Sequence, residues 1–192
     1  MSLELPFSNQ SIIPAAHNQK DMEKILELDL TYMVMLETHV AQLKALVKYA
    51  QAGGKKVLLH ADLVNGLKND DYAIDFLCTE ICPDGIISTR GNAIMKAKQH
   101  KMLAIQRLFM IDSSAYNKGV ALIQKVQPDC IELLPGIIPE QVQKMTQKLH
   151  IPVIAGGLIE TSEQVNQVIA SGAIAVTTSN KHLWEGHHHH HH

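Results

Sequence analysis

The sequence predicts an α/β fold, a single compact (β/α)8 barrel of the TIM type. Short apolar runs alternate with amphipathic helical segments along the chain, and eight such units follow one another without a break in composition. This alternation is typical of a parallel sheet covered by helices. The last two apolar runs open into polar turns, a feature of barrels that bind phosphate. An open, doubly wound sheet is the alternative, but the count of eight and the two final turns favour closure.

Each predicted strand is an apolar run rich in Ile, Val, Leu or Ala, as expected for strands that are buried on both faces. The seventh run ends at Gly156 and Gly157, and the eighth passes through residues 175–180. The first six are residues 11–17, 32–37, 56–62, 85–89, 102–109 and 130–134.

Start and stop signals indicate the helices between these strands. Residues 39–52 repeat apolar side chains at helical spacing and end at two glycines. Asn69 is expected to cap a helix over 70–82, and Pro139 suits the first turn of a helix over 139–149. The remaining helices are expected over 20–29, 92–100, from 113 or 114 onward, and 162–171.

Length and composition fit one domain. The chain has 192 residues, 46% of them hydrophobic and 4% aromatic. Residues 1–3 and 185–192, which end in six histidines, are expected to be vector-derived residues and a His tag, which leaves a single domain over 4–184. No apolar run is long enough to span a membrane and no signal peptide is visible, so we expect a cytoplasmic protein. The formal net charge of −2 argues against a strongly basic nucleic-acid binder, although a local patch is compatible with it.

The two final turns predict a phosphate-binding site. Gly156 and Gly157 follow the seventh strand, and Thr178 and Ser179 follow the eighth. Glycine allows backbone N–H groups to approach an oxyanion, and the start of the following helix adds a favourable dipole. The alternative is that the two glycines serve only as turn residues.

The carboxyl ends of the other strands supply polar residues to the same mouth. Carboxylates there would accept hydrogen bonds from hydroxyl groups, and cations would balance a phosphate, which suits a small hydroxylated phosphate ester. His60 and Asp62 are expected to point the same way, because alternate residues of a strand share a face. The alternatives are an Arg107–Glu132 ion pair, a core histidine and a loop-capping aspartate. The predicted polar residues are Glu37, His60, Asp62, Arg90, Arg107 and Glu132.

The residues do not demand catalysis. No lysine stands at a strand end where an aldolase would form its Schiff base. Cys78 and Cys82 are expected to pack in the core, because no further ligand completes a metal set, so neither a metal nor a cofactor is expected. Glu132 and His60 could serve as acid and base. An enzyme acting on a triose or sugar phosphate, either an isomerase or aldolase-like, therefore stays open.

Several strings resemble one family over essentially the whole native chain. They resemble the glycerol-3-phosphate-responsive antiterminators, the glycerol uptake operon antiterminator regulatory proteins. The resemblance implies a regulator rather than an enzyme, with glycerol 3-phosphate as its effector and the leader mRNA of glycerol-metabolism operons as its partner. The liganded protein would keep the terminator hairpin from stopping transcription. The strings are His60–Lys68, Gly85–Arg90, Ala104–Phe109, Ile131–Pro139, Ala155–Gly157 and Val176–Trp184.

The RNA surface is less well indicated. Lysines gather at helix C-termini and in the turns after them, on the face of a barrel opposite the ligand mouth. They predict a basic ring for RNA phosphates, and compensation of helix dipoles is the alternative. With ligand and RNA at opposite ends, the ligand would act through stability or through a homo-oligomer. The predicted RNA-binding residues are Lys55, Lys56, Lys98 and Lys101, near Lys125 and Lys148.

Overall fold

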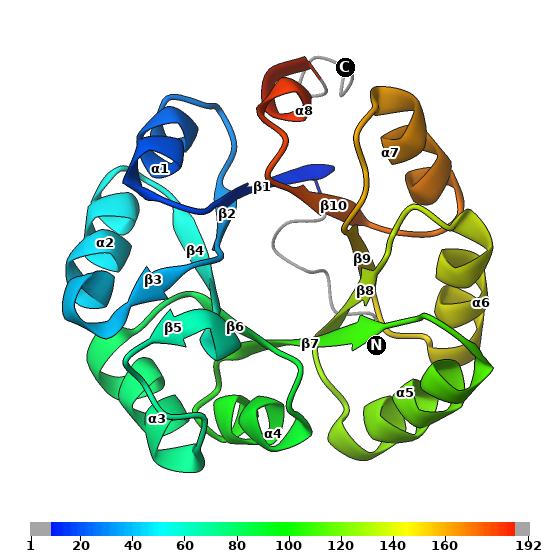
Figure 1. The fold of residues 1–192 in the computed structure, drawn as a ribbon, viewed down its shortest axis with the longest axis horizontal. Helices are drawn as coiled ribbons and strands as arrows, with labels where there is room; N and C mark the ends of the chain where they lie inside the picture. The colour runs from blue at the N-terminus through cyan, green and yellow to red at the C-terminus, as the bar shows by residue number, and fades with distance from the viewer. Residues whose placement is uncertain (1–8, 187–192) are drawn as a thin grey trace.

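Eight parallel strands pair side by side in the order β1-β10-β9-β8-β7-β6-β4-β2, and β2 pairs back onto β1. The sheet is therefore closed in this computed structural model, which describes residues 9–186, and helices surround it (Figure 1). The predicted (β/α)8 barrel is confirmed, and the open sheet is excluded. The barrel strands are β1 Ile12–Ala16, β2 Tyr32–Met35, β4 Lys56–His60, β6 Gly85–Ser88, β7 Leu103–Phe109, β8 Cys130–Leu134, β9 Val153–Gly156 and β10 Ala175–Thr178.

The helices begin at local capping signals. Pro139 occupies the first turn of α6, as predicted, and Thr161 with Gln164 forms a capping box at α7. Asp70, and not Asn69, caps α3 by accepting a hydrogen bond from the backbone N–H of Ala73. None of the helices within residues 9–186 is long and apolar enough to cross a membrane. The helices are α1 Gln19–Leu26, α2 Val40–Ala52, α3 Asp71–Phe76, α4 Gly91–Gln99, α5 Ser113–Val126, α6 Pro139–Leu149, α7 Ser162–Ala170 and α8 Lys181–Gly186.

Three local features depart from the sequence-based elements. The helix expected over 70–82 changes at its end into a π-helical turn, η2 Leu77–Ile81. The strand expected over 56–62 ends at His60, and Ala61–Leu63 forms the 3-10 turn η1. Two short segments, β3 Thr38–His39 and β5 Val64–Asn65, pair in parallel as a separate two-stranded sheet. They join the loops that follow β2 and β4 at the mouth.

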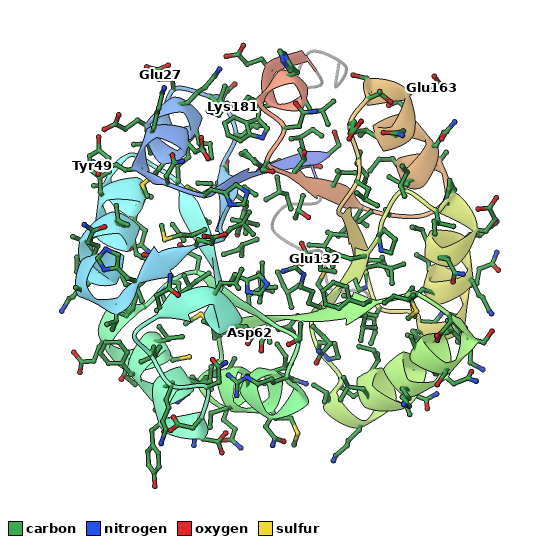
Figure 2. The ribbon with its side chains drawn as sticks, in the orientation of Figure 1. Glu27, Tyr49, Asp62, Glu132, Glu163 and Lys181 are labelled. Carbon is green, nitrogen blue, oxygen red and sulfur yellow. The ribbon has the colours of Figure 1, made fainter. Side chains whose placement is uncertain are left out.

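Two apolar layers hold the barrel together. Alternate strand residues such as Ile13, Val34 and Leu58 fill its interior, and a larger cluster packs between the strands and the helices. Trp184 belongs to the outer cluster, is fully buried, and donates from Nε1 to the Thr178 carbonyl at 2.8 Å, which fixes α8 to the end of β10. Figure 2 shows Glu132 inside the ring of strands, with Glu27 and Glu163 on its outside.

Candidate functional site

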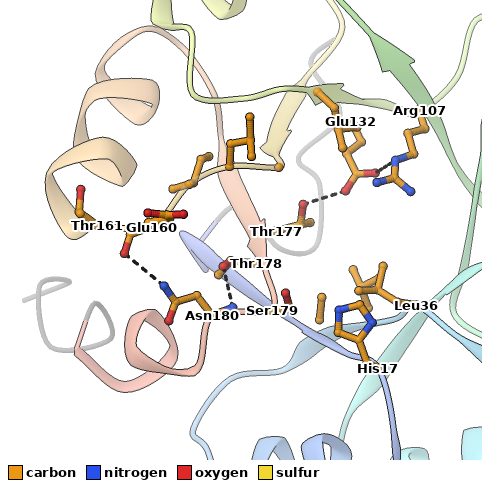
Figure 3. A pocket seen from close by; sticks show the side chains of 16 residues that line it. His17, Leu36, Arg107, Glu132, Glu160, Thr161, Thr177, Thr178, Ser179 and Asn180 are labelled. Carbon is orange, nitrogen blue, oxygen red and sulfur yellow. Dashed lines mark hydrogen bonds and ion pairs between the residues drawn. The ribbon is translucent and has the colours of Figure 1, made fainter.

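A cleft of about 720 Å³ opens at the carboxyl ends of the strands (Figure 3). Its walls come from β1, β7, β8 and the loops that follow β9 and β10. This is the end of the barrel at which the sequence placed a ligand mouth. The polar residues and glycine that line it are His17, Arg107, Glu132, Gly157, Glu160, Thr161, Thr177, Thr178, Ser179 and Asn180.

The predicted phosphate loops border this cleft, although their four residues differ in role. Gly157 lines it with φ of +79°, a conformation that favours glycine. Ser179 is exposed to it. Thr178 lines it as well, but its Oγ1 accepts from the Asn180 N–H at 3.0 Å and so also holds the turn. Gly156 lies behind the cleft surface, where a Cβ would meet Thr177 Oγ1 at 2.6 Å.

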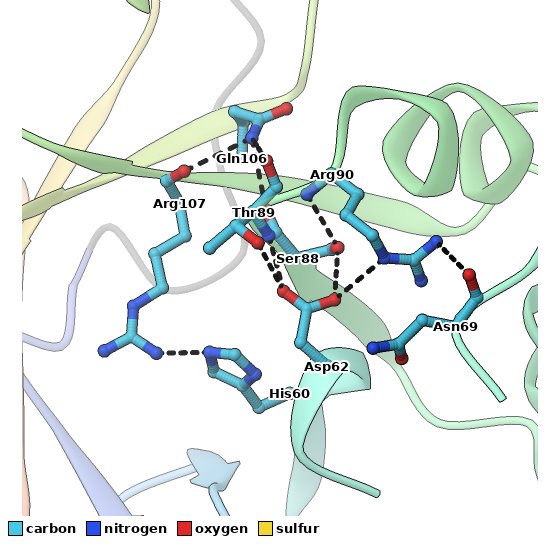
Figure 4. A network of polar contacts seen from close by, with 8 residues as sticks. All are labelled: His60, Asp62, Asn69, Ser88, Thr89, Arg90, Gln106 and Arg107. Atoms are coloured by element: carbon cyan, nitrogen blue, oxygen red, sulfur yellow. Dashed lines mark hydrogen bonds and ion pairs between the residues drawn. The ribbon is translucent and has the colours of Figure 1, made fainter. Parts of the chain in front are cut away.

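A buried polar cluster forms the floor of the cleft. Arg107 and Glu132 are register partners on β7 and β8, and Arg107 Nε lies 3.2 Å from Glu132 Oε1. Thr177 Oγ1 donates to Glu132 Oε2 at 2.7 Å. The Arg107 guanidinium also contacts His60 Nε2 (Figure 4). Of these residues, Arg107 and Glu132 were predicted from the sequence and line the cleft. His60 was also predicted but lies outside the lining, and Thr177 lines the cleft without having been predicted.

Burial shifts the pKa values of His60 and Glu132 in this cluster. Burial and the adjacent Arg107 charge lower the pKa of His60 to about 4, so its ring is neutral near pH 7 and Nε2 accepts from the guanidinium. Burial raises the pKa of Glu132, although Arg107 and Thr177 both act to lower it. Among the described residues, His60 Nδ1, Arg107 Nε and Glu132 Oε1 make no aligned hydrogen bond. Arg107 and Glu132 line the cleft, so their two atoms retain hydrogen-bonding capacity for a ligand, whereas His60 does not line it.

Asp62 and Arg90 lie outside the cleft lining and hold a loop instead. Asp62 accepts hydrogen bonds from Ser88 Oγ at 2.7 Å and from the N–H and Oγ1 of Thr89 at 2.7 and 2.8 Å (Figure 4). Arg90 Nε lies 3.4 Å from Asp62 Oδ1, and Arg90 Nη1 donates to the Asn69 carbonyl. The expectation that His60 and Asp62 point the same way was wrong, because the strand ends at His60 and Asp62 lies on the 3-10 turn. The loop-capping alternative is the observed arrangement.

Glu37 also stands outside the cleft lining. Its side chain is 61% exposed, and its Oε1 lies 3.7 Å from Nδ1 of His17, which does line the cleft. Asn180 and Thr161 line the cleft without having been singled out from the sequence. Strand alternation offered a signal for Thr177, because Ala175 two residues earlier faces the barrel interior.

Only some of the lysines predicted to bind RNA are exposed and free of contacts with backbone carbonyls. Lys55 is 8% exposed, and its ammonium donates to the carbonyls of Leu28 and Leu30, while burial lowers its pKa. Its proposed role in contacting RNA is therefore wrong. Lys98 donates to the carbonyls of Val126 and Gln127 at the end of α5, the helix-end role that was the alternative. Lys56 and Lys101 are exposed.

The chain matches the glycerol-3-phosphate responsive antiterminator family over residues 12–184. It belongs to this family. The family is regulatory and responds to glycerol 3-phosphate. Among the relatives is YgcP of Escherichia coli (strain K12), a protein described as uncharacterised, which is 30% identical over 173 residues that cover 90% of this chain and 91% of YgcP.

One solved structure supports the family assignment, and others share the fold. A glycerol uptake operon antiterminator-related protein from Thermotoga maritima MSB8 superposes with a TM-score of 0.81 at 30% identity, covering 91% of this chain and 98% of that one. The aldolase QR15 superposes with a TM-score of 0.70 at 15% identity, covering 91% and 92% of the two chains. Orotidine 5'-phosphate decarboxylase from Pyrococcus horikoshii OT3 superposes with a TM-score of 0.68 at 11% identity, covering 87% of this chain and 88% of that one. The last two share the barrel fold alone.

Proposed function

We propose that this protein is a glycerol 3-phosphate sensor that acts as a transcription antiterminator. The liganded protein binds the leader mRNA of glycerol-metabolism operons and keeps the terminator hairpin from stopping transcription. Membership of the family supports this role. The observation that carries the ligand assignment is the cleft itself, which joins a glycine and hydroxyl loop pair to a buried charged cluster with unused hydrogen-bonding atoms.

The phosphate of the ligand is assigned to the loops after β9 and β10. Gly157 presents backbone without a side chain there, and Ser179 adds an exposed hydroxyl. Backbone N–H groups and hydroxyls are the donors that barrels of this type use for phosphate. The cleft needs no metal or cofactor in this assignment, since glycerol 3-phosphate is an effector.

The glycerol end is assigned to the buried cluster. Glu132 Oε1 is an acceptor that suits a ligand hydroxyl, and Arg107 Nε is a donor beside it. Both atoms are desolvated, so a hydrogen bond from each would contribute more than at the surface, and a ligand without hydroxyl groups would leave them unpaired.

Sensing rather than turnover fits the residues that line the cleft. None of the described lining residues is a lysine or a cysteine, so this cleft offers neither a Schiff-base amine nor a thiolate. Glu132 forms an ion pair with Arg107, and His60 contacts the same guanidinium. Both interactions make these side chains less suited to transfer a proton to or from a substrate.

Two measurements on the purified protein test this function. Calorimetric titration should show binding of glycerol 3-phosphate that is much tighter than binding of glycerol or inorganic phosphate. Leader RNA transcribed from upstream of the glycerol-metabolism genes of the source genome should bind more tightly with the ligand than without it. Phosphorus NMR of a long incubation with glycerol 3-phosphate should show no product, and steady conversion would establish the enzyme alternative.

A further inference from the structure

The helices of the barrel wall differ strongly in charge. Together α4, α5 and α6 carry six lysines and one acidic residue. The other α-helices of the described chain carry five lysines and six acidic residues. The whole chain has a formal net charge of −2. The barrel therefore has a basic sector, although its overall balance is acidic.

The centre of this sector is the surface of α5 and α6, which contact each other on one side of the barrel (Figure 1). Lys118 and Lys125 are exposed and lie two turns apart on the same face of α5, about 10 Å along the helix axis. Lys144 and Lys148 are exposed one turn apart on α6. The Lys144 ammonium lies 4.0 Å from the ring centroid of Tyr116, so this lysine of α6 reaches to α5.

No carboxylate of α5 offsets these charges. The helix contains none, and Glu140 in the first turn of α6 is the single acidic residue of the pair. By contrast, Lys96 of α4 lies 3.4 Å from Asp75, and Lys98 is held by backbone carbonyls. The four lysines of α5 and α6 thus remain available to an anionic partner.

The N-terminal end of α5 is linked to the cleft through the end of β7. β7 carries Arg107 in the floor of the cleft and Phe109 two residues later, and the Arg107 Cζ atom lies 5.5 Å from the Phe109 ring centroid. The chain then enters α5 within a few residues. The N–H of Met110 donates to the Leu134 carbonyl at 2.7 Å, and Leu134 itself lines the cleft. A ligand that repositions Arg107 therefore acts directly on the segment that leads into α5.

We propose that the exposed lysines of α5 and α6, Lys118, Lys125, Lys144 and Lys148, hold the phosphodiester backbone of the leader RNA. The inference rests on the proposed function, because that function supplies the RNA. The partner fits by charge complementarity, since a row of ammonium groups without carboxylates attracts a polyanion and is repelled by basic proteins. RNA then binds along the barrel wall, from the middle of α5 and α6 to their C-terminal ends, which point away from the ligand cleft.

The test compares two variants that lose the same charge. In the first, Lys118, Lys125, Lys144 and Lys148 are changed to Gln. In the second, Lys20, Lys24, Lys44 and Lys48, which are exposed on α1 and α2, are changed to Gln. Leader RNA affinity is measured at several salt concentrations with saturating glycerol 3-phosphate, alongside ligand affinity and thermal unfolding.

The first variant should bind RNA about 10- to 100-fold more weakly, with the slope of log affinity against log salt reduced by about 0.7 to 0.9 for each RNA phosphate that a lysine no longer neutralises. The second should bind like the unsubstituted protein, and both should keep their ligand affinity and melting temperature. Equal losses in both variants would show that net charge alone matters and would overturn the surface assignment, as would no loss in the first. If the unsubstituted protein binds ligand but no RNA, the RNA role fails and this surface assignment fails with it. If it binds RNA but not glycerol 3-phosphate, the ligand proposal fails. The comparison of the two variants then still tests whether the lysines of α5 and α6 bind the RNA.

Discussion

Arg107 Nε lies 3.2 Å from Glu132 Oε1, yet neither atom makes an aligned hydrogen bond with any described residue. Both side chains are largely buried, at 18% and 5% exposure. The two charges still attract each other at this distance. Because the N–H group does not point at the carboxylate oxygen, both atoms can still form a hydrogen bond with a ligand. The pair is thus both a structural ion pair and a candidate ligand contact, and the alternatives raised from the sequence do not exclude each other.

The first prediction separates these two roles. Arg107→Met leaves Glu132 buried without its cation, and Glu132→Gln leaves Arg107 without its anion, so each should destabilise the fold by about 3 kcal/mol. The double variant removes both charges and should be more stable than either single variant. All three should bind glycerol 3-phosphate weakly. Urea unfolding and calorimetry measure the two effects, and undiminished ligand affinity in the stable double variant would make the pair purely structural.

The second prediction concerns pH. His60 has its pKa lowered to about 4 in the folded protein, whereas a histidine in the unfolded chain titrates near its ordinary value of 6.5. Between these values the unfolded state binds the extra proton, so stability should fall as pH falls from 6.5 toward 4. One proton gives a slope of about 1.4 kcal/mol per pH unit.

The control for this prediction is His60→Gln, which keeps a polar side chain but has no titration. Acidic residues also titrate toward the lower end of the window, and Glu132, with a raised pKa, acts in the opposite direction. Their contributions are largely shared by both proteins, so the difference between the two stability curves isolates His60. Parallel curves from pH 7 to 4 would contradict a neutral, buried His60.

Much of the fold could be predicted because its signals are local. The apolar runs and helix caps lie within single segments, and Gly157 and Ser179 follow strand ends in a fold whose ligand mouth is known. Asp62 could not be placed, because its orientation depends on where β4 ends and on the donors offered by Ser88 and Thr89. Lys55 was misassigned for a similar reason: its carbonyl partners come from the loop before β2.

The third prediction tests the phosphate loops. Ser179→Ala removes an exposed hydroxyl from the cleft, which should cost about 1 to 3 kcal/mol of glycerol 3-phosphate binding if it donates to the charged phosphate. Because Ser179 is exposed, the melting temperature of the ligand-free protein should not change. Ser114→Ala, on the exposed face of α5, is the matched control. Equal affinity of both variants would place the phosphate elsewhere in the cleft.

The fourth prediction concerns the Asp62 clamp. Burial acts to raise the pKa of Asp62, but hydrogen bonds from Ser88 and Thr89 outweigh it and lower the pKa. The charged form therefore stabilises the fold above the ordinary carboxyl pKa, and this contribution is lost as pH falls below it. Asp62→Ala should cost about 1 to 3 kcal/mol of stability at pH 7, because the buried Ser88 hydroxyl loses its acceptor. Ligand affinity measured by calorimetry should stay the same. A loss of ligand binding without a loss of stability would show that Asp62 contacts the ligand.

The fifth prediction concerns communication between the cleft and the α5–α6 surface. Phe109→Ala removes the ring beside the Arg107 guanidinium, an interaction worth about 0.5 to 1 kcal/mol at an exposed site, so ligand affinity should change little. The ratio of RNA affinities with and without glycerol 3-phosphate should fall toward one, since this ratio measures the coupling free energy. Tyr49→Ala on α2 is the control, because Tyr49 is 47% exposed and Phe109 is 49% exposed. If Phe109 instead stacked on an RNA base, affinity would fall equally with and without ligand and the ratio would persist. That result would make Phe109 an RNA-binding residue and would exclude it as the link between the two sites.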